Sequence, residues 1–135
     1  MTSPKAPRTT EVAGEIQPVA AGADLTTVLG RVPEDGVVGA VTFSPAAAIA
    51  GATTNTRTLT LVNKGQDGTG NTAVAALALV SGVNPAAADE YAFTLSGTPA
   101  NLNVAAGDIL EVTSAHASSG LADPGGFVRV TIGRG

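Results

Sequence analysis

Short stretches in which apolar and polar residues alternate recur through most of the chain. In RTLTLV (57–62), Leu59 and Leu61 fall on one face and Thr58 and Thr60 on the other, which is the period of a strand with one buried face. Turn signals separate these stretches at intervals of about ten to fifteen residues, too short for the helical crossovers of a parallel sheet. The pattern predicts an all-β fold: a single antiparallel β-sandwich of about seven or eight strands, jelly-roll or Ig-like. The expected strands are 37–43, 57–62, 72–80, 91–95, 101–104, 109–113 and 127–132.

One stretch departs from this alternation because it is apolar on both sides. In TAVAALALV (72–80), Ala75, Leu77 and Leu79 fall on one side of the strand, and the other side is small and apolar as well. A sandwich strand buries one face in its own core, so the second face has to be covered by something else. The candidates are segment 16–32, a connecting turn or a neighbouring subunit. The residues predicted to pack there are Val74, Ala76, Ala78 and Val80.

The composition also favours a covered surface. Charged residues make up 13% of the chain, about half of the usual share. The hydrophobic residues are mostly Ala, Val and Leu, so few long side chains are present to keep a large surface wet. Either a partner covers part of the surface, or the protein is a monomer with an exterior rich in Thr and Ser.

The N-terminus differs from the rest of the chain. Residues 1–15 are rich in Pro, Thr and Ser and lack periodicity, which predicts an extended arm over residues 1–20 before a sandwich domain over residues 21–135. Lys5 and Arg8 lie in this arm with no acidic residue among the first ten, whereas the remainder holds five basic and eleven acidic residues. A basic arm on an acidic body predicts docking against an acidic surface; the alternative is a disordered start with two incidental charges.

The charge and hydropathy exclude some partners. The net charge of −4 argues against nucleic acid. The N-terminus lacks the apolar region of a signal peptide, and the longest apolar run, AVAALALV, is less than half of a membrane span. We therefore expect a protein made in the cytoplasm, with no nucleic-acid or membrane partner.

The sequence contains few candidates for catalytic or metal-binding residues. The chain has no cysteine and one histidine, His116, which rules out thiolate and paired-histidine metal sites. A Ser/His/Asp arrangement would combine His116 with Ser114 or Ser118 and Asp123, but these lie in a loop-like stretch without a nucleophile elbow. An exposed loop histidine is the simpler interpretation. We expect no enzyme activity, no catalytic residue, no cofactor and no metal.

Three loop segments need an interpretation. The glycine-rich NKGQDGTGN (63–71) has its lysine before the glycines and a strand after them, the wrong order for a phosphate-binding loop. It is predicted to be a long, mobile connection. SPAAAIAG (44–51) and NPAAADE (84–90) each begin with a capping residue and a proline, so they are predicted to be helical turns that connect strands.

Two blocks of the sequence resemble small β-sandwich head decoration proteins, which stabilise the capsids of tailed phages that infect actinobacteria. The blocks are VTFSPAAAIAGATTNTRTLTLVNKGQDGTGNTAVAALAL and LNVAAGDILEVTSAHASSGLADPGGFVRVTI. The resemblance covers about residues 37–133 and rests on the phrases TNTRTLTLVNKG, VAAGDILEV and GLADPGG. These phrases belong to the fold and contain no catalytic signature.

The resemblance implies a structural virion protein on the outer capsid surface. Such proteins bridge major capsid protein subunits, often as homotrimers at threefold or quasi-threefold positions. The arm would then lie along the capsid, and deleting residues 1–20 should weaken binding while the sandwich still folds. The alternative is a phage tail or fibre domain, or an adhesin that binds a host-surface glycan. The residues predicted to contact the capsid are Lys5, Arg8, Ile16 and Val19.

Overall fold

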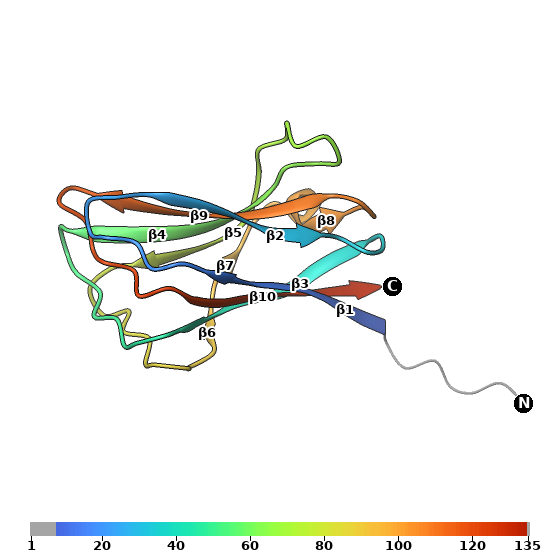
Figure 1. The fold of residues 1–135 in the computed structure, drawn as a ribbon. Helices are drawn as coiled ribbons and strands as arrows, with labels where there is room; N and C mark the ends of the chain where they lie inside the picture. Colours follow the sequence, from blue (N-terminus) through green and yellow to red (C-terminus); the bar gives the residue numbers. More distant parts are fainter. Residues whose placement is uncertain (1–7, 135) are drawn as a thin grey trace, which may run out of the picture.

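The computed structural model describes residues 8–134 and has two antiparallel sheets packed face to face (Figure 1). The β1 sheet has the strand order β1-β10-β3-β6, and β8 also pairs with β3. It consists of β1 (Arg8–Ile16), β3 (Gly36–Pro45), β6 (Tyr91–Ala92), β8 (Asn103–Val104) and β10 (Gly126–Arg134).

The second sheet, here the β2 sheet, has the order β2-β9-β4-β5-β7. Its members are β2 (Leu25–Arg31), β4 (Thr56–Asn63), β5 (Thr72–Leu79), β7 (Thr94–Leu95) and β9 (Ile109–Ala117). The predicted all-β fold with two packed antiparallel sheets is confirmed.

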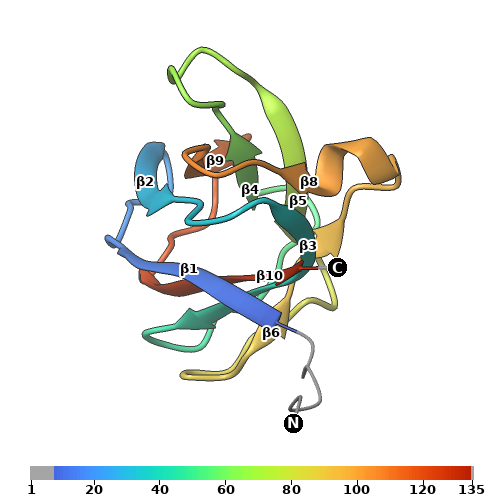
Figure 2. The same cartoon turned by 90° about the vertical axis from the view of Figure 1, so that its right-hand side faces the viewer.

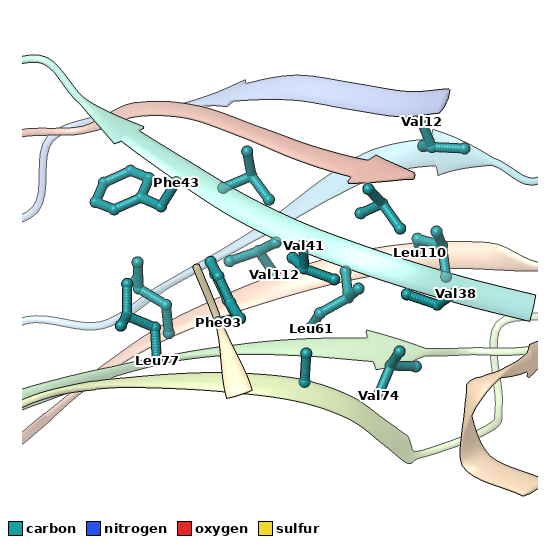
Figure 3. Close-up of a cluster of buried hydrophobic side chains, with 14 of the residues drawn as sticks. Val12, Val38, Val41, Phe43, Leu61, Val74, Leu77, Phe93, Leu110 and Val112 are labelled. Atoms are coloured by element: carbon teal, nitrogen blue, oxygen red, sulfur yellow. The ribbon is translucent and has the colours of Figure 1, made fainter. Parts of the chain in front are cut away.

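The core lies between the two sheets and follows the predicted alternation (Figure 3). Leu59 and Leu61 of β4 are fully buried, and the threonines between them face outward. Burial of these aliphatic side chains is the main source of stability in a domain that has no disulfide. The largest buried hydrophobic residues also include Phe43, Leu79, Leu110 and Ile132.

Both open sides of the sandwich are closed by the chain itself. On one side β1 and β2 lie against each other at the edges of their sheets, as the end-on view shows (Figure 2). On the other side residues 91–104 cross between the sheets. There the Phe93 amide donates to the Val41 carbonyl at 2.8 Å and the Ser96 amide to the Val74 carbonyl at 2.8 Å. This crossing covers strand edges that would otherwise invite pairing with other chains.

The predicted boundary between arm and sandwich at residue 20 is wrong for the residues that the structure describes. From Arg8 to Ile16 the chain is strand β1, paired residue by residue with β10. Val12 and Ile16 are buried in the core. Gly14 lies between them against β2, where a Cβ would come within 3.1 Å of the Leu29 side chain. A strand with only two large core residues is too weak a periodic signal to recognise.

The two predicted helical turns are also absent from the described structure. Segments 44–51 and 84–90 contain no helix, and the helix that the structure describes is a single 3₁₀ turn, η1 (Pro99–Leu102). Instead the two alanine-rich segments bond to each other. The Ile49 amide donates to the Pro85 carbonyl at 2.9 Å, and the Gly51 amide donates to the Val83 carbonyl at 3.1 Å. Tertiary pairing therefore overrides a weak local helix signal.

Candidate functional site

The residues of β5 that were predicted to pack against a partner do not all lie on the same face of the sheet. Val74 is fully buried in the core, so its assignment to the outer face is wrong. The cause is a bulge: Leu61 pairs with Ala75 but Val62 pairs with Ala73, which leaves Val74 as the extra residue. A bulge shifts the alternation of a strand and turns one side chain to the other face.

The remaining three residues of that set lie on the outside. Ala78 and Val80 are exposed and Ala76 is half-buried, with no described segment of the chain packed over them. Segment 16–32, which the sequence offered as a cover for this face, does not lie over it. Its first residue, Ile16, is in the core, and the segment then forms β2 at the far edge of the same sheet.

Of the residues predicted to contact a capsid, some are buried in the sandwich and so cannot do so. Ile16 and Val19 are buried within the sandwich, with 3% and 8% of their surface exposed, and so are not available to a partner. Arg8 begins β1 and pairs with Arg134 at the end of β10. Lys5 lies outside the described residues. Of this set only the basic residues at the start of the chain remain as candidates.

The outer face of the β2 sheet is made mostly of small side chains, and we call it the neutral face. It contains six threonines, five alanines, three valines, one isoleucine and two residues of opposite charge, Arg31 and Glu111. Alternation places these residues opposite the buried positions of the same strands. They are Thr26, Val28, Arg31, Thr56, Thr58, Thr60, Val62, Ala73, Ala76, Ala78, Val80, Thr94, Ile109, Glu111, Thr113, Ala115 and Ala117.

The outer face of the β1 sheet is different, and we call it the charged face. At its centre Arg129 of β10 pairs with Glu90 at 2.7 Å and with Glu11 at 3.3 Å. Glu15 and the exposed Phe127 lie in the next row across the strands. This face has the mixed charge of an ordinary solvated surface.

The possible Ser/His/Asp arrangement does not form. Ser114 donates to the Asp123 carboxylate at 2.8 Å in a buried contact. His116 instead faces Asp24, with its Nδ1 atom 2.6 Å from the carboxylate oxygen and its backbone amide 2.9 Å from the same oxygen. Among residues 8–134, the hydrogen-bond partner of the histidine ring is therefore a carboxylate and not a serine, and this partner, Asp24, was not among the residues considered from the sequence.

A buried arginine organises this end of the sandwich. Arg57 is fully buried and donates to Ser114, which links it to the Asp123 carboxylate. Its other donors reach backbone carbonyls of the two loops at this end, residues 17–24 and 118–125. The accepting residues are Ala20, Ala21, Ala23 and Leu121. Sequence reasoning missed this cluster; the signal was an arginine at a core position of RTLTLV, in register with Leu59 and Leu61.

The Asp24 carboxylate is held in its charged form by His116. The backbone amide of His116 is the largest cause of the lowered pKa of Asp24, and the hydrogen bond from the His116 ring is the second. Hydrogen bonds to a carboxylate favour its ionised form. This pair fastens the end of loop 17–24 to β9.

The glycine-rich loop 63–71 is tied down at both ends, contrary to the predicted mobile connection. The Gly70 amide donates to the Lys64 carbonyl at 2.8 Å, and Gln66 Nε2 donates to the Ala106 carbonyl at 3.0 Å. Thr69 donates to Asp67 through its hydroxyl and its amide, and these bonds lower the pKa of Asp67. These contacts hold the loop against the neighbouring turn and explain its polar residues.

A shallow groove of about 290 Å³ lies between Ile49 and Leu121. The Asp123 oxygens beside it are already bonded to Ser114 and Gly125. Within residues 8–134 no group of three or more acidic, histidine or cysteine side chains is placed to hold a metal. No helix among these residues is long and apolar enough to cross a membrane.

Comparisons of the chain with protein-family models, with curated proteins and with solved structures gave no match. The arguments for function therefore rest on the residues and their arrangement.

Proposed function

We propose that this protein is a structural component of a phage virion that decorates the outer capsid surface and bridges major capsid protein subunits. The proposal starts from the resemblance over residues 37–133 described above. The observation that carries it is the neutral face, a sheet surface made mostly of threonine, alanine and valine, on which the two charged residues, Arg31 and Glu111, are of opposite sign. Such a surface favours contact with another protein over catalysis or recognition of a charged ligand.

The strand order gives fold-level support, and we propose a jelly-roll topology. With β6 and β7 counted as one strand that contributes to both sheets, and the two-residue β8 left out, the sheets have the orders 1-8-3-6 and 2-7-4-5-6. Two interlocked Greek keys produce these orders, and jelly rolls are frequent in viral capsid proteins. Because one fold serves many functions, this support is an analogy and does not replace the argument from the surface.

The basic start of the chain is the proposed capsid contact. Residues Lys5 and Arg8 precede or begin β1, and the pairing of β1 with β10 sets Arg134 beside Arg8. Arg8 and Arg134 therefore lie side by side at the end of the sandwich where β1 begins and β10 ends (Figure 1). An acidic strip on a capsid would attract this end and orient the domain as it docks.

Binding to the assembled shell would stabilise the shell by linkage. A protein that binds only where several subunits meet adds its binding free energy to the assembled state and none to the free subunits. The resemblance implies threefold sites and a homotrimer, and we retain that arrangement as part of the proposal.

Co-sedimentation tests this function. The full chain should sediment with capsids assembled from the major capsid protein encoded near its gene and should leave free capsid subunits in the supernatant. Lys5→Glu with Arg8→Glu should weaken capsid binding, and rising salt should weaken wild-type binding, because the contact is electrostatic. Ser119→Glu with Ala122→Glu, which adds acidic charge at two exposed residues of the loop at the opposite, Arg57 end of the sandwich, is the control and should bind normally. Failure of the full chain to sediment with capsids at low salt would reject the proposed function.

A further inference from the structure

The charged face has mixed charge as a whole but differs between its middle and one end. Its middle holds Arg129 between two glutamates, whereas the end nearer loop 118–125 has an exposed aromatic ring, Phe127, beside an exposed carboxylate, Glu15. We propose that these two residues, here the Phe127 patch, bind an arginine side chain on a major capsid protein subunit. The inference rests on the proposed function and names the second surface of a bridging protein.

Phe127 is the aromatic residue that the fold leaves exposed. Its side chain is 42% exposed, whereas Phe43 and Phe93 are buried and Tyr91 is half-buried. The alternation of β10 explains the direction: Val128 is fully buried in the core, so Phe127 before it points away from the core. Aromatic residues are enriched at the centres of protein interfaces, so this exposure favours contact with a partner.

Glu15 supplies a carboxylate next to this ring. It lies directly opposite Phe127 across β1 and β10, and opposite residues of an antiparallel pair have Cβ atoms about 4.5–5.5 Å apart. Among residues 8–134, no hydrogen bond or ion pair engages the Glu15 carboxylate. A ring and a carboxylate side by side match a guanidinium group, which stacks on the ring and donates hydrogen bonds to the carboxylate at the same time.

The neighbouring charges favour a cation at this position. Arg129 lies in the next row across the strands, and its charge is offset by Glu90 at 2.7 Å and by Glu11 at 3.3 Å. With Glu15 added, this part of the charged face has three acidic side chains and one basic side chain. The electrostatic potential over the Phe127 ring is therefore negative, so an incoming arginine has the complementary charge, whereas a phosphate or a carboxylate would be repelled.

The position of the Phe127 patch suits a bridge between two subunits. The proposed basic contact, with Arg8 beside Arg134, lies at one end of the β1–β10 pair, and the Phe127 patch lies towards the other end. Seven steps along β1 from Arg8 to Glu15 correspond to about 24 Å of extended strand. The two contacts have opposite charges, so a capsid surface that attracts one repels the other. They therefore bind different regions of the shell.

Binding of an arginine peptide to the purified full chain tests the patch without a capsid. In a nuclear magnetic resonance titration, a capped glycine-arginine-glycine peptide should shift the backbone amides of Glu15 and Phe127 more than amides elsewhere. The same peptide with uncharged citrulline in place of arginine should not. Phe127→Leu and Glu15→Gln should each raise the Kd at least about threefold, whereas Phe127→Tyr keeps the ring and should bind like the wild type. Asp67→Asn removes an exposed carboxylate of loop 63–71 and is the matched control for charge.

Co-sedimentation with capsids then tests the partner. Phe127→Leu combined with Glu15→Gln should weaken capsid binding about tenfold, while Asp67→Asn should not, and thermal unfolding shows whether each variant is folded. Equal shifts with arginine and citrulline, or unchanged affinity in both single variants, would overturn the arginine site. Full capsid binding by the double variant would overturn the capsid subunit as its partner. A wild type that binds the peptide at Phe127 but does not sediment with capsids would reject the proposed function and the assigned partner together, and would leave the arginine site standing, so the two failures are distinguishable.

Discussion

At each end of the sandwich an arginine donates to backbone carbonyls of two neighbouring segments, but the two arginines differ in burial. At one end Arg57 is fully buried and holds loops 17–24 and 118–125. At the other end Arg31 is exposed and donates to the Gly107 carbonyl at 3.0 Å and to the Gln66 carbonyl at 3.5 Å.

Because of this difference in burial, removal of each arginine should lower the free energy of unfolding by a different amount. The guanidinium of Arg57 is fully buried and the carbonyls that it holds are partly buried, so water replaces this donor less readily than it replaces Arg31. The two loops are also bonded directly, since Val19 and Asp123 exchange backbone hydrogen bonds of 2.8 and 2.9 Å. Gly120 belongs to the same contact, because a Cβ there would collide with the Ala21 carbonyl. The comparison indicates that the Arg57 end holds the fold together, while the end with the termini is free to serve binding.

Truncation from the N-terminus should have the largest effect on stability. A short deletion removes residues proposed to bind the capsid, whereas a longer deletion also removes strand β1, which is part of the fold. Removing residues 1–7 deletes Lys5 but leaves β1 intact, so the melting temperature should stay within about 2 °C of the full chain. Removing residues 1–16 deletes β1 with Val12 and Ile16, exposes the edge of β10 and should abolish cooperative unfolding. Circular dichroism during heating measures both. A fully stable protein without residues 1–16 would show that β1 is not an integral strand.

Arg57→Ala should be the most damaging of the single substitutions discussed here. The variant loses all donors to four carbonyls and leaves Ser114 and Asp123 buried without their cationic partner. Loss of one partner from a buried charged network costs about 3–5 kcal/mol of unfolding free energy. Arg57→Lys should recover only part of the loss, because an ammonium lacks the planar fork that reaches several acceptors. Urea denaturation measures these differences, and a loss below about 1 kcal/mol would contradict the role of Arg57.

Arg31→Ala tests the exposed arginine at the other end of the sandwich. Water replaces an exposed donor readily, so the loss of unfolding free energy should be about 0.5–1.5 kcal/mol. The same urea experiment applies, with Arg57→Ala measured beside it. Equal losses for the two arginines would remove the distinction between the ends.

Much of the fold was predictable because it follows from local alternation. The strands around Leu59, Val112 and Val130 have clear buried faces, and their period of two fixes sheet structure in the sequence itself. Strand β1 was missed because the core face of RTTEVAGEI contains only Val12 and Ile16 as large apolar residues, with Gly14 between them. Its existence depends on pairing with β10, a contact between the two ends of the chain.

The errors at the site have related causes. Val74 faces the core because of a bulge, and nothing in TAVAALALV marks where the extra residue falls. The neutral face was visible only as one strand, since its width depends on the order β2-β9-β4-β5-β7. Arg57 was recognisable as a charged residue in a core register, but its acceptors lie 34 to 64 residues away in sequence. Long-range contacts of this kind leave no local pattern.

Asp24→Asn should have the smallest effect, and its dependence on pH identifies the cause. The pKa of Asp24 is lowered in the folded protein by the amide and ring of His116. Its charged form therefore adds stability above the ordinary aspartate pKa of about 3.9, and that contribution is lost as the pH falls through the lowered value. At pH 6 the variant should melt about 1–3 °C below the wild type, because the pair is exposed. The gap should close towards pH 2, where both proteins lack the charge. Asp67→Asn, at the opposite end, provides a control with the same sign, since Thr69 lowers the pKa of Asp67. A gap for Asp24→Asn that stays constant from pH 6 to pH 2 would mean that its carboxylate charge does not fasten the loop.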